Sequence, residues 1–181
     1  PRPYPHWKAL LEDRDVDAIV IGTWPYMHHT LTLASLEKGK HVLCQARMAN
    51  TAQEAREMLA ASLRYPELVA QLVPTSTSYR VDNIVRKLVA DGFVGDVLSV
   101  EIQRVGRGFA ETDGPLDWRH NHEFSGLNIL NTGSTYESMM RWLGRGNRIM
   151  AMSKSHVPYR KGPAGVKSSV ALPDHVDVLY E

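Results

Sequence analysis

The stretch Asp17-Ala18-Ile19-Val20-Ile21-Gly22 decides the fold class. Its four consecutive apolar residues end on a glycine, which is the pattern of a short buried strand. Two further strands are expected at residues 41–44 and 68–73. Because helical segments separate the three runs, the order strand, helix, strand, helix, strand predicts a parallel sheet with crossover helices, as in part of a doubly wound α/β domain.

Helix signals fill both gaps between these strands. The segment 26–38 carries apolar residues near helical spacing, and Gly39 supplies the left-handed residue that commonly closes a helix. Thr51 and Glu54 form a capping-box signature at the start of the next helix. We expect one face of that helix to carry small and apolar residues, namely Ala52, Ala55, Met58 and Leu59.

The second half of the chain has a different pattern of elements. A helix with apolar residues at 84, 85, 88 and 89 precedes an expected long strand over 96–105 and a polar loop over 106–123. A long helix then carries one apolar stripe, made of Ile129, Gly133, Tyr136, Met140 and Leu143. Strands are expected at 149–153 and 176–180, with a loop rich in Gly and Pro between them. This half is therefore predicted to be an α+β domain with an open, mostly antiparallel sheet.

The composition excludes several classes of protein. Hydrophobic residues make up 43% and charged residues 23% of the 181 residues, which is typical of a globular protein. Twenty-one Lys and Arg against 20 Asp and Glu give a formal charge of +1, too low for a protein that tracks nucleic-acid phosphates. No apolar run approaches a membrane span, and the single cysteine, Cys44, suits a reducing compartment. We expect no nucleic-acid partner, no membrane insertion and a cytoplasmic location.

The order and spacing of several motifs resemble those of the Gfo/Idh/MocA oxidoreductases, a family named for glucose-fructose oxidoreductase and inositol 2-dehydrogenase. In this sequence they are residues 16–28, 36–44, 51–59, 92–100, 117–119, 125–126 and 141–144. The resemblance implies a Rossmann domain that binds NAD or NADP, followed by an α/β domain whose open sheet forms homo-oligomer contacts. It also implies a small carbohydrate substrate, such as a sugar, an inositol or a related polyol.

The resemblance also implies domain limits. Residues 1–78 correspond to the C-terminal portion of the Rossmann domain, and residues 79–181 to the N-terminal portion of the substrate and oligomerisation domain. A dinucleotide site should open with G-x-G-x-x-G between a strand and a helix, and the sequence has no such motif. By this alignment Pro1 falls after the first strands of the family's Rossmann domain, so we expect the chain to be a central fragment of a longer enzyme.

Two departures from the family pattern bear on the chemistry. The family usually has Glu-Lys-Pro where this chain has Gln45-Ala46-Arg47. The family's lysine positions substrate and shuttles a proton, which Ala46 cannot do. Arg47 supplies a cation one position later, but its guanidinium stays protonated and cannot act as a base. We expect Arg47 to stabilise developing negative charge on the substrate oxygen, so that another residue takes the proton.

The second departure lies in the long helix, where the family often has ionisable residues facing the substrate. This chain has Asn131, Thr135 and Ser138 at those positions. We expect Asn131 and Thr135 to contact substrate. Tyr136 adjoins the position of the lost histidine and is a candidate acid or base, with a packing role on the apolar stripe as the alternative.

Other residues implied by the resemblance lie near the cofactor. These are Thr23, Trp24, Pro25, His28, Gln45, Trp118 and Arg119. For His28 the alternative is a local hydrogen bond at the start of a helix, and for Trp118 it is a packing anchor.

His120 and His122 form an H-x-H pair in the polar loop. His122 is a candidate proton acceptor, and no metal site is expected because further ligands are not apparent. Three functions remain open on the sequence: a nicotinamide-dependent dehydrogenase or reductase, a non-catalytic binding or assembly protein that kept the fold, and a metal-assisted enzyme built on the two histidines. The first is our main expectation.

Overall fold

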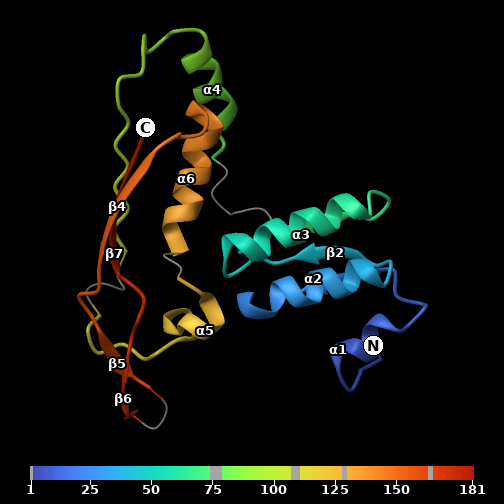
Figure 1. Cartoon of the computed structure of the whole chain (residues 1–181). Coiled ribbons are helices and arrows are strands. Elements are labelled where there is room, and N and C mark those ends of the chain that lie inside the picture. The colour runs from blue at the N-terminus through green and yellow to red at the C-terminus, as the bar shows by residue number, and fades with distance from the viewer. Residues whose placement is uncertain (1, 74–78, 107–110, 128–129, 163–164) are drawn as a thin grey trace. The chain divides into compact units, whose positions relative to one another are not determined.

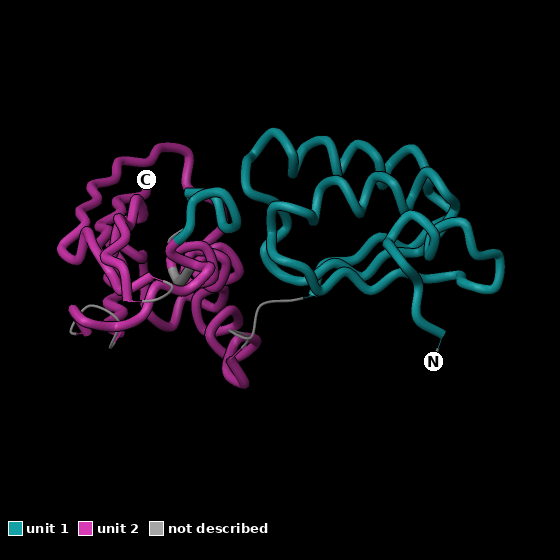
Figure 2. Tube along the Cα trace, turned by 90° about the horizontal axis from the view of Figure 1, so that it is seen from below, with its two compact units in different colours: residues 1–74, 121–127 teal, residues 75–120, 128–181 magenta. Residues whose placement is uncertain are grey.

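The computed structural model describes residues 2–73, 79–106, 111–127, 130–162 and 165–181. The chain divides into two compact units (Figure 2), of which unit 1 comprises residues 1–74 and 121–127, and unit 2 comprises residues 75–120 and 128–181. The segment 121–127 thus belongs to unit 1, although it lies far along the sequence. The expected domain limit at residue 78 falls outside the described residues. No helix in the described ranges is long and apolar enough to cross a membrane.

Unit 1 is built around a three-stranded parallel sheet (Figure 1). Its strands β1 (Ala18–Ile21), β2 (His41–Cys44) and β3 (Ala70–Leu72) lie in sequence order, with Ile21 paired to Cys44 and Cys44 to Leu72. The other elements of this unit are α1 (Trp7–Leu11), η1 (Pro25–Met27), α2 (His28–Glu37), α3 (Ala52–Arg64) and α5 (His122–Ser125). The predicted α/β fold and the parallel order are confirmed.

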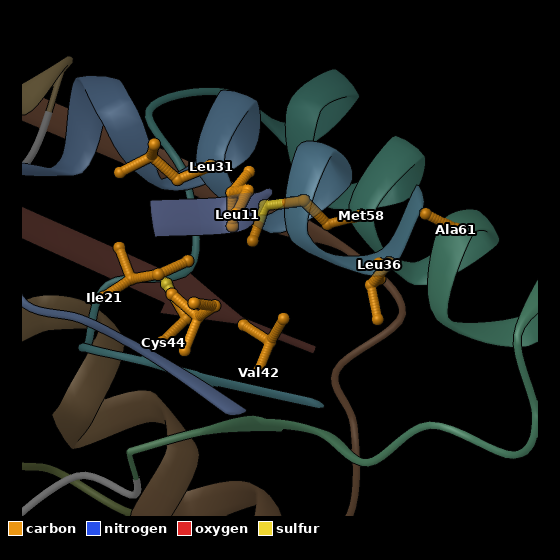
Figure 3. Packing of buried hydrophobic residues seen from close by; sticks show 9 residues of the cluster. Leu11, Ile21, Leu31, Leu36, Val42, Cys44, Met58 and Ala61 are labelled. Atoms are coloured by element: carbon orange, nitrogen blue, oxygen red, sulfur yellow. The ribbon is translucent and has the colours of Figure 1, made fainter. Parts of the chain in front are cut away.

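The core of unit 1 lies between this sheet and the helices α2 and α3 (Figure 3). Burial alternates along β1 and β2 but not along β3, whose three residues are exposed. In β1, Ile19 and Ile21 are buried, whereas Val20 between them is 74% exposed. The apolar run of β1 is therefore covered on one face only in the described structure. Leu36 of α2 is completely buried and packs in the cluster with the strand residues.

The ends of the helices follow the sequence signals. Thr51 accepts the backbone N–H of Glu54 at 3.1 Å, and the Glu54 carboxylate accepts the Thr51 N–H, so the capping box is present. Gly39 closes α2 with a φ of 70°. The predicted apolar face of α3 is partly wrong: Met58 and Ala61 are buried, but Leu59 is 55% exposed because it lies just outside the narrow stripe that faces α2 and the sheet.

Unit 2 contains helices and short antiparallel strand pairs. Its elements are α4 (Asp82–Ala90), η3 (Trp118–His120), α6 (Leu130–Leu143), β4 (Ile149–Lys154), β5 (Tyr159–Lys161), β6 (Lys167–Ser169) and β7 (His175–Tyr180). β4 pairs with β7 in antiparallel register, from Ile149 opposite Tyr180 to Lys154 opposite His175. The antiparallel C-terminal strands predicted from the sequence are confirmed.

Two predictions for unit 2 are wrong. Residues 96–105 do not form a strand, although they are rich in β-formers. Within the described ranges no strand pairs with them, and Leu98 and Val105 are each 93% exposed. The loop expected after β4 contains the hairpin β5–β6, in which Arg160 pairs with Ser168. Its Gly and Pro residues flank these short strands rather than preventing them.

Candidate functional site

The turns that follow β1 and β2 form one edge of the unit 1 sheet. Parallel pairing of Ile21 with Cys44 places Thr23 and Gln45 at the same carboxyl edge, and the Gln45 N–H donates to the Ile21 carbonyl at 2.9 Å. In open α/β sheets, ligands bind outside the carboxyl ends of the strands. Thr23 and Gln45 are exposed there, whereas Pro25 is buried.

His28 lies behind this edge and is completely buried. Its Nδ1 lies 2.6 Å from the carbonyl oxygen of Arg47, and its Nε2 lies 3.0 Å from the carbonyl oxygen of Thr23. Both ring nitrogens therefore face backbone carbonyls of the two turns. This geometry favours the local hydrogen-bonding role over direct contact with a cofactor.

Arg47 follows the β2 turn and is half-buried. The peptide bond that joins it to Ala46 is cis. Its permanent positive charge sits on the same turn as Gln45, one residue beyond the position where the family's lysine is expected. The turn can therefore present a cation, although it cannot present a base.

The segment 121–127 adds aromatic surface to unit 1. Phe124 of α5 stacks at a tilt against Trp24, with ring centroids 4.5 Å apart, and against Tyr26 at 5.6 Å. Trp24 and Tyr26 are still 43% and 44% exposed. His122 is exposed on the same short helix. The structure thus brings His122 into the unit that holds the β1 and β2 turns.

A glycine allows this segment to approach the β2 turn. Gly126 has φ 62° and ψ −170°, a conformation that is essentially restricted to glycine. A Cβ at this position would lie 2.9 Å from the carbonyl oxygen of Asn50. The Ser125-Gly126 pair that formed part of the family resemblance therefore has a steric role where the segment docks.

Trp118 and Arg119 lie in unit 2, on η3. The Arg119 guanidinium lies over the Trp118 ring, 4.2 Å from its centroid, and the Arg119 N–H donates to Asp117. The Asp117 N–H in turn donates to His120 Nδ1 at 3.0 Å. Burial, followed by the nearby Arg160 charge, lowers the pKa of His120. These contacts fix the conformation of the Asp117–His120 turn.

The residues predicted on the long helix also lie in unit 2. Tyr136 is half-buried and stacked on Tyr180 with centroids 4.3 Å apart, and its hydroxyl accepts the Gly146 N–H at 3.2 Å. These contacts favour the packing role that was the alternative for Tyr136. Thr135 is half-buried, and the Asn131 side chain lies outside the described residues.

Cys44 and the pair His120 and His122 are the remaining candidate reactive side chains. Cys44 is buried at the end of β2, and burial raises the pKa of its thiol, which suits an unreactive core position. Within the described ranges, no three His, Cys, Asp or Glu side chains are grouped so as to hold a metal ion.

Sequence reasoning missed Tyr26 and Phe124. Tyr26 lies at a predicted helix start and Phe124 directly follows the predicted polar loop, and only their contact across the fold shows that they belong to one cluster. The available signal was Phe124 itself, one of three phenylalanines in the chain, three residues after the helix-capping residue Asn121.

The comparisons with known proteins agree with this architecture. Residues 2–70 match the model of the Gfo/Idh/MocA family, described as an oxidoreductase family with an NAD-binding Rossmann fold. Over this part of its length, the chain is similar to the Gfo/Idh/MocA oxidoreductases. The resemblance noted in the sequence is therefore confirmed.

Several known proteins are similar to this chain over nearly its whole length. Levoglucosan dehydrogenase of Pseudarthrobacter phenanthrenivorans is 24% identical over 161 residues, which are 88% of this chain and 41% of that protein. The crystal structure of an oxidoreductase domain protein from Kribbella flavida superposes with a TM-score of 0.81 at 29% identity, over 97% of this chain and 48% of that one. Levoglucosan dehydrogenase in complex with NADH and levoglucosan has the same fold, with a TM-score of 0.77 at 21% identity over 98% and 48% of the two chains. The chain thus spans less than half the length of these relatives.

Proposed function

We propose that this protein is an NAD(P)-dependent oxidoreductase that transfers a hydride between a nicotinamide cofactor and a sugar, an inositol or a related polyol. The observation that carries the proposal is the site at the carboxyl edge of β1 and β2, in a chain that is similar to the Gfo/Idh/MocA oxidoreductases. The names of the relatives support a carbohydrate or anhydrosugar substrate.

The sheet of unit 1 fits one half of a dinucleotide site. In the usual doubly wound order 3-2-1-4-5-6, the second half consists of three parallel strands lying in sequence order, as β1, β2 and β3 do here. The glycine turn that receives the pyrophosphate belongs to the first half, and residues 1–181 contain no G-x-G-x-x-G. The residues present therefore suit the nicotinamide end of NAD or NADP.

Each candidate residue has a role that its chemistry allows. Thr23, Trp24, Pro25 and Gln45 would hold the nicotinamide end of the cofactor, which accepts or donates the hydride when bound. Arg47 would stabilise negative charge that develops on the substrate oxygen.

The proton and the outer contacts are assigned to other elements. His122 would take the proton through its imidazole, with Tyr136 of unit 2 as the second candidate. Trp118 and Arg119 would contact cofactor or substrate, and Asn131 and Thr135 would contact substrate.

The proposal also covers the oligomeric state and the cellular location of the protein. We place the enzyme in the cytoplasm and propose a homo-oligomer formed through the C-terminal sheet. The β4–β7 pair supports this because its strands carry large apolar side chains at the surface, with Met150 73% and Leu179 69% exposed.

The test is a cofactor assay on the protein produced from its complete open reading frame. Levoglucosan, glucose and myo-inositol are offered with NAD+ and with NADP+, and appearance of the reduced cofactor is followed. We expect turnover with at least one pair. If sugar binds in calorimetry while no cofactor is reduced under any condition, the protein is a binding member of the family, as the replacement of the usual lysine by Ala46 would allow.

A further inference from the structure

His28 joins the two turns that form the proposed site. It begins α2, yet its ring lies below the surface between the turn after β1 and the turn after β2. Nδ1 faces the Arg47 carbonyl at 2.6 Å, and Nε2 faces the Thr23 carbonyl at 3.0 Å. The exposed fraction of the residue is 0%. A cofactor or substrate in the site therefore meets the turns and does not meet the histidine.

The chemistry of the imidazole ring determines which of the two possible hydrogen bonds forms. A carbonyl oxygen only accepts hydrogen bonds, and a neutral imidazole has a single N–H to donate. The shorter distance lies on the Arg47 side, which selects the tautomer that carries its proton on Nδ1. In that tautomer Nε2 carries no proton, so it does not donate to the Thr23 carbonyl.

We propose that His28 is a positioning residue that holds the Arg47 turn through an Nδ1–H bond to the Arg47 carbonyl. The bond fixes the backbone from which the Arg47 side chain projects, so the guanidinium keeps its place relative to the Thr23 turn. This inference rests on the proposed function for its effect on turnover, but the bond itself is a property of the structure. Misplacement of a charged group by about 1 Å is enough to cost ~100-fold in rate.

The first experiment detects the Nδ1–H hydrogen bond without an activity assay. Nitrogen-15 and proton spectra of histidine-labelled protein report which ring nitrogen of His28 carries a proton. We expect a proton on Nδ1, protected from exchange with solvent, at neutral pH. An unprotonated Nδ1 would overturn the proposal, whatever the enzyme assay shows.

The second experiment separates the two bonds by substitution. The amide nitrogen of Asn reaches approximately the position of Nδ1, and that of Gln reaches the position of Nε2. His28→Asn should therefore keep the Arg47 bond, whereas His28→Gln loses it and places its amide N–H near the Thr23 carbonyl instead. We expect His28→Gln to lower kcat by ~10- to 100-fold with little change in KM, and His28→Asn to remain within ~3-fold of the wild type. Equal losses in both variants would contradict the proposal.

A double-mutant cycle shows whether His28 acts through Arg47. In an Arg47→Ala background, His28→Gln should change kcat by less than ~2-fold, because the group that it positions is gone. Additive losses would mean that His28 supports the fold generally. If the wild type reduces no cofactor, the proposed function fails. The histidine spectra, together with the backbone amide shifts of residues 45–48 in the two variants, still show whether His28 donates to the Arg47 carbonyl.

His41 provides the matched control. Its Nδ1 accepts the Val69 N–H at 2.9 Å, so it too joins a side chain to a neighbouring loop, but at the opposite end of β2. His41→Gln should lower the melting temperature to a similar or greater extent than His28→Asn and leave kcat within ~2-fold. A fall in kcat for His41→Gln that matches the fall for His28→Gln would show that loss of stability alone explains the effect.

Discussion

The two units of this chain use similar sequence patterns to different effect. In unit 1 nine buried hydrophobic residues form one cluster, which includes α2, α3 and the first two strands. In the described part of unit 2 the buried hydrophobic residues are Val157, Val170 and Leu172. Hydrophobic periodicity therefore identifies helices and strands in both units, but it predicts burial only where another layer faces the stripe.

The helices α3 and α4 make the contrast concrete. Both have a regular apolar stripe, and α3 buries Met58 and Ala61 against α2 and the sheet. No residue of α4 is buried, and Ile84 on its stripe is 58% exposed. Polar contacts instead connect α4 to α6. Asp82 accepts the Trp142 Nε1–H at 2.9 Å and pairs with Arg141 at 3.1 Å.

The largest expected effect tests this difference in burial. Leu36→Ala removes a completely buried side chain and should lower the free energy of unfolding by about 2–5 kcal/mol. Ile84→Ala in unit 2 should cost less than about 1 kcal/mol, as should Leu63→Ala on the exposed face of α3, where Leu63 is 72% exposed. Urea denaturation measures all three. A loss for Ile84→Ala as large as that for Leu36→Ala would show that α4 is covered in the protein.

The second prediction compares the chemistry of the two units. Arg47→Ala should lower kcat/KM by ~100-fold or more, which is comparable to the loss of one preorganised donor. Tyr136→Phe keeps the ring stacked on Tyr180 and should lower it by less than ~10-fold, because general acid–base residues typically contribute ~100- to 10,000-fold. Arg64→Ala, an exposed cation at the end of α3, is the control. A larger loss for Tyr136→Phe than for Arg47→Ala would assign the proton transfer to unit 2.

The third prediction concerns the segment that unit 1 receives from the second half of the chain. Gly126→Ala places a Cβ on a backbone conformation that is essentially restricted to glycine, and this Cβ would also clash with the Asn50 carbonyl. The substitution should destabilise the protein by about 1–3 kcal/mol. Gly133→Ala, in α6 with open space around its Cβ position, should instead stabilise it by about 0.5–1 kcal/mol. Thermal unfolding of the pair checks the signs. Equal shifts in the same direction would mean that 121–127 does not dock as described.

The smallest expected effect is a pH dependence in unit 1. A hydrogen bond from Gln53, and then one from His29 of α2, lower the pKa of Glu57 below 4.5. Because the folded pKa is depressed, the contribution to stability is present above pH 4.5 and disappears as the pH falls through the lower folded value. Glu57→Gln should therefore be slightly less stable than the wild type at pH 7 and equal to it in strong acid. A stability difference that is constant across this range would exclude the linkage.

The sequence predicted the parts of the fold that depend on local signals. The strand at residues 41–44, the capping box of Thr51 and Glu54, and the end of α2 at Gly39 all depend on neighbouring residues. The strand expected at 96–105 failed because a strand exists only with a partner, which local sequence does not show. The hairpin β5–β6 was hidden by the turn residues that surround it.

The family resemblance predicted which positions of the sequence form the candidate site. It did not predict the role of a side chain whose role depends on its contacts in the fold. The turns at Thr23 and Gln45 meet at the edge that strand order requires. The burial of His28 and the packing of Tyr136 depend on groups that lie far away in the sequence, the Arg47 carbonyl and the Tyr180 ring. A histidine or tyrosine can serve in catalysis or in packing, and only its neighbours distinguish the two.

The docking of Phe124 on Trp24 also bears on the order in which the protein is made. About 100 residues separate the two rings in sequence, so closing this contact carries the entropic cost of a long loop. During synthesis, the three strands and their crossover helices leave the ribosome well before residue 124 does. Strands β1, β2 and β3 can therefore pair while Trp24 and Tyr26 still lack their contact with Phe124. A chaperone that binds aromatic surface would act on this edge of the nascent chain.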